Sequence, residues 1–314
     1  MSLKILDTDQ LPLVPAFEGF RQNRPDTCLL AGQSRCGVWF GRSDSQGERY
    51  GVIGHYWAED SQQSLQLLTT ACDLLRENGC ATVYGPMDGN TWKPYRFVTW
   101  SDGSPPFLME PQHPPQWPQF WLEAGFTPRH EYLSTITHDL ATRDERLVEV
   151  KARLAEAGIT WQQIDLGHFG EELAKIYRVS LETFSQNVLY TGIDQPTFLQ
   201  QYLPFADHVD PRYVLLAHDK GGDCCGFLFA IPDLLQLKQG KTLDRLIIKT
   251  FAVRASIRRQ GLVSVLVDEI RQTARQNGFS SVITAFMHSG NVSTKVGRNN
   301  VPLRRYTLFA RTLS

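Results

Sequence analysis

One stretch decides how the second half of this chain is understood: Arg254-Ala255-Ser256-Ile257-Arg258-Arg259-Gln260-Gly261-Leu262-Val263-Ser264-Val265-Leu266. It follows an apolar, strand-like run over residues 247–253 and opens a pattern with apolar residues three and four apart, which predicts an amphipathic helix. A basic, glycine-containing turn at the start of a helix presents unpaired backbone N–H groups and the positive end of the helix dipole. Gly261 allows the backbone to come close to a bound anion, and Arg258 and Arg259 add positive charge. We therefore expect an anion, such as a phosphate group, to bind at this turn.

The sequence contains two copies of one unit. Residues 75–83 read Leu-Arg-Glu-Asn-Gly-Cys-Ala-Thr-Val, and residues 274–282 read Ala-Arg-Gln-Asn-Gly-Phe-Ser-Ser-Val, at an offset of 199. Each Asn-Gly ends an amphipathic helical stretch and precedes a strand-like stretch, as expected of a helix closed by a C-terminal glycine. Strand-like segments over residues 50–56 and 246–253 precede the two helices. The shared unit is therefore strand, helix, strand, which implies a right-handed crossover.

The remaining pattern predicts a mixed α/β or α+β chain with a central sheet in each half. We expect strands at residues 127–140, 159–164, 213–217, 226–231, 281–286 and 305–312, and helices at 169–184 and 196–205. The proline-rich segment 101–118 is predicted to be a loop. Residues 141–151 are polar and charged, so we place the boundary there and expect two domains, 1–140 and 141–314.

The second half resembles the GCN5-related N-acetyltransferase (GNAT) superfamily, in which a Val-ending strand precedes Arg/Gln-x-x-Gly-x-Gly/Ala at the start of a long helix. The matching residues are Val253, Arg258, Gly261 and Leu266, with Val263 at the position where a small residue is usual. After this helix the chain continues with the Asn277-Gly278 helix end, a further strand and then Asn291. This is the order of elements in the cofactor-binding half of the family. The resemblance implies two tandem GNAT-like domains, each a mixed, largely antiparallel sheet flanked by helices.

The same resemblance implies a chemistry: direct transfer of an acyl group, usually acetyl, from coenzyme A to an amine, with acetyl-CoA as co-substrate and no metal. The backbone of Phe251 and Val253 would pair with the pantetheine arm. The N–H groups of Arg259, Gly261, Val263 and Ser264 would hold the pyrophosphate. The whole cofactor segment comprises Phe251, Ala252, Val253, Arg258, Arg259, Gln260, Gly261, Leu262, Val263, Ser264 and Asn291.

The general base and acid are left open by the sequence. The family often uses a Tyr after the strand at residues 281–286, but residues 289–301 contain none. Four candidates remain: Asn291 beside the thiol end, His288 as a base, Ser293 as a donor to the thiolate, and Tyr306 on the last strand. Three of them also have a structural explanation, since Tyr306 can pack in the core, Ser293 can cap a helix, and His288 can be a hydrogen-bonded structural residue.

The first copy is not expected to bind coenzyme A. The offset of 199 places Glu59, Asp60 and Gln62 opposite Arg258, Arg259 and Gly261, and two carboxylates would repel a phosphate. After its second strand this copy carries a loop over residues 84–97 with candidate acceptor-binding residues. These are Asp88, Asn90, Trp92 and Tyr95. The loop can equally be a Gly-Pro turn with aromatic packing.

Charge and composition narrow the possible partners. The net charge is −1, but residues 241–314 hold thirteen Lys or Arg against three acids, which gives +10 there and −11 elsewhere. Such a field suits a polyphosphate ligand or nucleic acid, or is simply a solvated face. The six cysteines show no CxxC pair, which argues against a zinc site. Without a long apolar run or signal-like start, we expect a cytoplasmic protein with no membrane partner.

The acceptor is expected to be a small-molecule or peptide amine of unspecified identity. Two other functions stay open: a non-catalytic ligand sensor on the same tandem fold, and an aminoacyl- or peptidyl-transferase that uses charged transfer RNA. The phosphate motif favours coenzyme A over a nucleic acid partner. The sequence does not indicate the oligomeric state.

Overall fold

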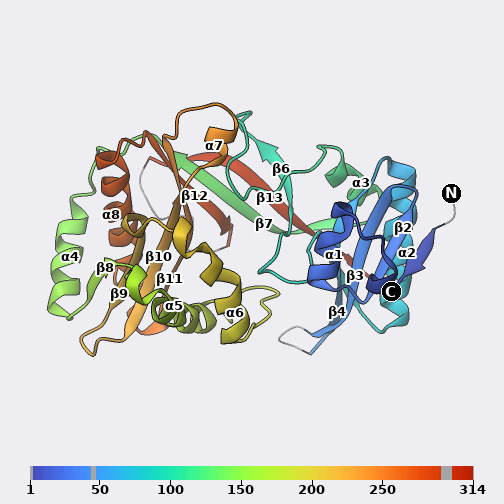
Figure 1. Cartoon of the computed structure of the whole chain (residues 1–314), viewed down its shortest axis with the longest axis horizontal. Coiled ribbons are helices and arrows are strands. Elements are labelled where there is room, and N and C mark those ends of the chain that lie inside the picture. The colour runs from blue at the N-terminus through green and yellow to red at the C-terminus, as the bar shows by residue number, and fades with distance from the viewer. Residues whose placement is uncertain (1–2, 44–46, 291–298, 314) are drawn as a thin grey trace. The chain divides into compact units, whose positions relative to one another are not determined.

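The computed structural model describes residues 3–43, 47–290 and 299–313, coloured along the chain in Figure 1. The chain forms two compact units, Met1–Ser101 with Glu110–Tyr132 and Arg304–Ser314, and Asp102–Met109 with Leu133–Leu303. The sequence predicts consecutive domains that meet at residues 140 and 141, whereas these units are interleaved. The reason is that two long strands, β7 (Thr127–Thr137) and β13 (Val301–Thr312), contribute residues to both units.

The first unit is a sheet covered by helices. Its strand order is β1-β2-β3-β4-β5-β13-β7, and β6 also pairs with β13. The additional elements are β1 (Lys4–Leu6), α1 (Glu18–Asn23), β2 (Thr27–Ala31), β3 (Ser34–Ser43), β4 (Arg49–Trp57), α2 (Ser61–Glu77), β5 (Thr82–Gly85), β6 (Phe97–Ser101) and α3 (Trp117–Glu123). Leu67, Leu68 and Leu75 of α2 are fully buried in a core that also contains Trp121 and Phe309.

The second unit is built on the strand order β7-β12-β11-β10-β9-β8. Its elements are α4 (Arg146–Glu156), β8 (Thr160–Gln163), α5 (Phe169–Phe184), α6 (Gln195–Tyr202), β9 (Val214–His218), β10 (Cys224–Pro232), α7 (Leu235–Lys238), β11 (Arg245–Val253), α8 (Leu262–Gln276) and β12 (Ser281–His288). The predicted mixed α/β class is confirmed. The segment placed at the domain boundary is instead partly helical, because α4 lies over α8 with Leu154 buried.

The internal repeat is visible in the hydrogen bonds that end α2 and α8. The N–H groups of Gly79 and Cys80 donate to Arg76 and Leu75, and those of Gly278 and Phe279 donate to Arg275 and Ala274. Both glycines have positive φ, as this helix ending requires. In both copies the strands that flank the helix are parallel, β4 with β5 and β11 with β12. The predicted strand-helix-strand unit is therefore present twice.

The two copies differ in the link between the first strand and the helix. Tyr50 pairs with Thr82 and Arg245 pairs with Ser281, so the strands β4 and β11 correspond at an offset of 195 rather than 199. The link spans residues 58–60 in the first copy and 254–261 in the second. The extra residues of the second copy are the basic, glycine-containing turn. The residue-by-residue comparison made at an offset of 199 is thus wrong on the strand side of this link.

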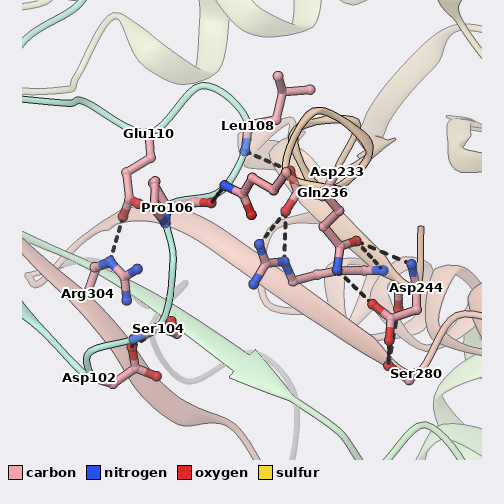
Figure 2. A network of polar contacts seen from close by, with 12 residues as sticks. Asp102, Ser104, Pro106, Leu108, Glu110, Asp233, Gln236, Asp244, Ser280 and Arg304 are labelled. Atoms are coloured by element: carbon pink, nitrogen blue, oxygen red, sulfur yellow. Dashed lines mark hydrogen bonds and ion pairs between the residues drawn. The ribbon is translucent and has the colours of Figure 1, made fainter. Parts of the chain in front are cut away.

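The proline-rich segment is a loop, as predicted, but part of it is buried in the second unit. Phe107 is fully buried against Ile247 and Ile283, on the sheet face opposite the one that packs on α8. The Leu108 N–H donates to Asp233 Oδ1 at 2.8 Å, and Asp233 also binds the Arg245 guanidinium at 2.5 Å (Figure 2). The segment is therefore held by a buried ion pair as well as by its apolar side chains. Across the described ranges, no helix has the length and apolar character required to cross a bilayer.

Candidate cofactor-binding site

Strands β11 and β12 separate partway along their length. Their parallel pairing runs from Arg245 and Ser281 to Ile248 and Thr284, although both strands continue. Two irregularities accompany the separation. The register between β10 and β11 skips Lys249, and Phe286 has a φ of 58° and donates its N–H to Ser134 Oγ at 3.1 Å. From Thr250 to Val253, the edge of β11 that faces β12 has no strand paired with it among the described residues.

The orientation of the peptide groups on this edge follows from the antiparallel pairing of β11 with β10, in which successive residues direct their backbone N–H and C=O groups to opposite sides of the strand. The Arg254 N–H donates to Cys225 O, and Ala252 pairs with Phe227, so these two residues direct their backbone groups toward β10. Phe251 and Val253 therefore direct theirs the other way, into the fork between β11 and β12. This arrangement is what an extended, amide-containing ligand needs in order to pair with the strand, as predicted for the pantetheine arm.

The turn after β11 leaves a row of backbone donors unused. A 3₁₀ turn, Ala255–Ile257, is followed by Gly261, which is the N-cap of α8 with a φ of 90° and supplies no side-chain cap. The N–H groups of Arg259, Gly261, Leu262, Val263 and Ser264 donate to no residue within the described ranges. These donors lie at the positive end of the α8 dipole, where an anion is stabilised. The residues present therefore fit a pyrophosphate group.

Neighbouring helices hold this turn in place. Glu182 of α5 accepts the Ala255 N–H at 3.4 Å and lies 3.4 Å from Arg254 Nε. A Cβ added to Gly261 would lie 2.6 Å from Val150 Cγ1 of α4, so only glycine fits. Arg258 and Arg259 are exposed, and among the described residues neither forms an ion pair. Their charges are thus available to a ligand. Glu182 and Val150 were not identified from the sequence.

The corresponding region of the first copy is already filled by the chain itself. Asp60, the N-cap of α2, accepts the Gln63 N–H at 2.7 Å with its own carboxylate. Beside β4, the Met87 N–H donates to Ile53 O at 2.8 Å, and the His55 N–H donates to Asp88 Oδ1 at 2.6 Å. The first copy therefore has neither an uncapped helix start nor an unpaired strand edge of the kind found in the second.

Two of the four predicted catalytic residues, His288 and Tyr306, lie within the described structure, one in each unit. His288 ends β12, and its Nδ1 accepts the Gly290 N–H at 3.1 Å, which leaves the proton of the neutral ring on Nε2. Tyr306 belongs to the first unit, where it is fully buried and donates its hydroxyl to Glu110 Oε1 at 3.1 Å. Asn291 and Ser293 lie outside the described residues.

The candidate acceptor-binding residues all lie in the first unit and are half-buried. Asp88 binds His55, and Asn90 Oδ1 accepts the Trp92 N–H at 2.9 Å. Tyr95 stacks on the Arg96 guanidinium, 3.9 Å from the ring centroid. The side chains of Asp88, Asn90 and Tyr95 thus have partners within the protein, and an acceptor-binding role remains a prediction. No group of three or more His, Cys, Asp or Glu positioned to hold a metal occurs in the part of the chain that the structure describes.

Comparison with known proteins supports the resemblance. The acetyltransferase (GNAT) family profile matches residues 173–295, which include the fork and the turn. A GCN5-related glucosamine N-acetyltransferase region of a fungal multi-domain GH3 β-N-acetylglucosaminidase shares the fold with a TM-score of 0.57 and 14% identity, over 99% of this chain and 38% of that one. This chain therefore spans less than half the length of that protein. No curated protein is similar enough in sequence to match.

Two further structures cover the whole chain. A probable N-acyltransferase from Enterococcus faecalis has a TM-score of 0.55 at 11% identity, over 100% of this chain and 73% of that one. A tandem GNAT protein from the clavulanic acid biosynthesis pathway has a TM-score of 0.50 at 11% identity, over 100% and 99%. At these identities the likeness concerns the fold. Residues 173–295 thus match the acetyltransferase (GNAT) family, and the chain shares its fold with a solved tandem GNAT structure.

Proposed function

We propose that this protein is an acyl-CoA-dependent N-acyltransferase that uses acetyl-CoA and a small-molecule or peptide amine. The observation that carries the proposal is the row of unused N–H groups at residues 259 and 261–264, directly after the unpaired edge of β11. The first feature suits a pyrophosphate and the second an amide-containing arm, and coenzyme A contains the two groups directly joined. A phosphate-binding turn alone would suit many ligands.

In the proposed reaction the amine nitrogen attacks the thioester carbonyl carbon, a C–N bond forms, and the C–S bond breaks. The amine loses a proton to a base, and the departing thiolate of coenzyme A takes up a proton. The chain contributes mainly by positioning, since Phe251 and Val253 would align the arm and the α8 N-terminus would fix the pyrophosphate. Because His288 Nδ1 already accepts a hydrogen bond, this side chain is better suited to donate from Nε2 than to act as the base.

In this proposal the first copy does not bind coenzyme A. Its helix start is capped by Asp60, and the 86–88 segment lies along the edge of β4 that would otherwise pair with the arm. A carboxylate at the cap both satisfies the donors and opposes a phosphate charge. The proposal therefore predicts one acetyl-CoA bound for each chain.

The test is calorimetric titration of acetyl-CoA into the native protein, Ser264→Asp and Ser264→Asn. Ser264 is half-buried in the first turn of α8, where an acidic residue is compatible with the helix dipole, so Ser264→Asp should fold. The added carboxylate would lie at the proposed pyrophosphate position, whereas Asn has the same shape without the charge. We expect micromolar binding to native protein with one site, binding near this level for Ser264→Asn, and none for Ser264→Asp.

Failure of the native protein to bind acetyl-CoA would reject the proposal, and equal binding by the Asp and Asn variants would reject the site. Release of free thiol in the presence of a panel of amines then separates an enzyme from a protein that only binds the cofactor. The acceptor is identified by the amine that gives thiol release in native protein but not in Ser264→Asp.

A further inference from the structure

A cavity of about 190 Å³ opens in the first unit, at the carboxyl end of β4. Gly19 and Phe20 of α1 form one wall, and Arg35 of β3 with His55 and Trp57 of β4 form the other. Neither the family resemblance nor the proposed reaction assigns a role to this cavity. It lies at the strand end that corresponds to the fork of the second copy, where the first copy cannot accept a coenzyme A arm.

Arg35 gives the cavity a positive charge that no carboxylate of the described residues neutralises. Its guanidinium lies 5.4 Å from the Trp57 ring centroid and 5.6 Å from that of Phe17. Its one hydrogen bond to a described residue is from Nη1 to Gln33 O at 3.3 Å, and no carboxylate of the described chain comes within 4 Å. Burial lowers the pKa of Arg35, and no neighbouring charge contributes to that shift. A half-buried cation of this kind is stabilised when an anion binds beside it.

An acidic side chain that contacts the cavity wall is already engaged. Asp88 binds His55 through both oxygens, with Oδ1 2.6 Å from the His55 N–H and Oδ2 3.2 Å from Nδ1. The other ring nitrogen, Nε2, lies 3.1 Å from Asn23 Nδ2, which can only donate. His55 is therefore fixed as a wall between Asp88 and the cavity, and Asp88 itself is not a lining residue.

We propose that this cavity binds a small monocarboxylate with a flat apolar body, with the carboxylate on Arg35 and the apolar body against the exposed Trp57. A single guanidinium pairs in a bidentate manner with a carboxylate or a phosphate, but its one positive charge is balanced by one carboxylate and not by a phosphate that carries nearly two negative charges. The volume is comparable with the roughly 150 Å³ that accommodates a benzene ring in a protein interior. The first copy then serves as a binding module for an organic acid.

The probe is 4-fluorobenzoate, with binding to the full chain followed by fluorine NMR line broadening. The neutral 4-fluorobenzamide has the same shape and serves as the charge control. The variants are Arg35→Gln and, as a matched control on the same strand, Arg42→Gln. We expect at least tenfold weaker 4-fluorobenzoate binding to Arg35→Gln, unchanged binding to Arg42→Gln, and little binding of the amide to native protein.

A second variant keeps the proposal testable if Arg35→Gln does not fold. Ala16 is exposed at the cavity rim, so Ala16→Leu should fill the opening without disturbing the core, and should also abolish binding. No binding to native protein, equal binding of acid and amide, or equal binding to native protein and Ala16→Leu would each overturn the proposal. Displacement of the probe by acetyl-CoA would place it in the second unit and overturn it as well. These outcomes do not depend on the proposed acyl transfer.

Discussion

Asp60 and Gly261 are the N-caps of the corresponding helices α2 and α8, and only Asp60 supplies a side-chain acceptor to its own helix, 2.7 Å from the Gln63 N–H. The same strand-helix-strand unit thus occurs twice in one chain, once with its helix N-terminus capped by a side chain (the closed form) and once with it uncapped (the open form). In the closed form the protein's own carboxylate occupies the position of an anionic ligand. In the open form, a longer link and a glycine leave the donors unused.

The exposed arginines of the turn should govern how tightly acetyl-CoA binds. Replacing Arg258 by Gln, or Arg259 by Asn, should each weaken binding roughly tenfold, because each removes a charge-assisted contact. Asn is chosen at position 259 because the backbone there has a φ of 74°, which Asn tolerates. Calorimetry at low and high salt should show a smaller salt dependence for both variants. Arg275→Gln, at the far end of α8, is the control, and an equal loss in that variant would contradict the prediction.

Gly261→Ala should destabilise the protein for two separable reasons. The added methyl group would contact Val150, and the φ of 90° is unfavourable for any residue with a Cβ. We expect a loss of about 1–3 kcal/mol in the free energy of unfolding. In a double-mutant cycle measured by urea denaturation, Val150→Ala should recover the steric part, so that the double variant loses less than the sum of the two single losses. Strict additivity would mean that Val150 does not constrain this glycine.

Asp233→Ala should be among the more damaging single substitutions. Asp233 is fully buried, and its removal leaves Arg245 without its partner and the Leu108 N–H without its acceptor. Breaking a buried pair of this kind costs about 3–5 kcal/mol. Asp207→Ala is the matched control, because Asp207 is exposed and should change stability by less than about 0.5 kcal/mol. Similar stabilities of the two variants by thermal denaturation would contradict the role given to this ion pair.

Stability should fall as the pH rises above about 9. All six cysteines are buried, and burial raises the pKa of Cys28 and of Cys72 to about 11 and that of Cys225 to about 12. In the unfolded chain these thiols ionise at a lower pH, so their stabilising contribution is complete below the unfolded pKa and disappears as the pH rises toward the folded value. Urea denaturation between pH 7.5 and 10.5 measures the slope. Cys28→Ala should make that slope shallower, and an unchanged slope would show that this thiol does not contribute.

The sequence predicts the local elements of the second unit well. The helix Phe169–Phe184 has the predicted bounds, and the turn, α8 and the Asn277-Gly278 ending follow from periodicity and glycine chemistry alone. The capped start of α2 was also readable, since Asp60 is followed three residues later by Gln63. Helix α4 was missed although Leu147, Val150 and Leu154 recur at helical spacing, because charged residues dominate the segment.

Long-range features could not be predicted in this way. The separation of β11 from β12 depends on the pairing of Phe286 with Ser134, which are 152 residues apart. Likewise, Phe107 lies in a proline-rich loop with no periodic pattern, and its burial depends on Ile247 and Ile283. The first strands of the two copies correspond at an offset of 195, the helix N-caps at 201 and the helix ends at 199, so no ungapped sequence alignment could register the whole unit.

The membership of residues 304–314 in the first unit has a consequence for synthesis on the ribosome. Strand β13 supplies Phe309 to the core of that unit and pairs with β5, so the unit cannot complete its sheet until residues 301–312 emerge. At about 5–20 residues per second, roughly 170 further residues after Tyr132 take on the order of 10–30 s to translate. During that interval the nascent first unit exposes an unpaired edge at β5, where a chaperone would be expected to bind.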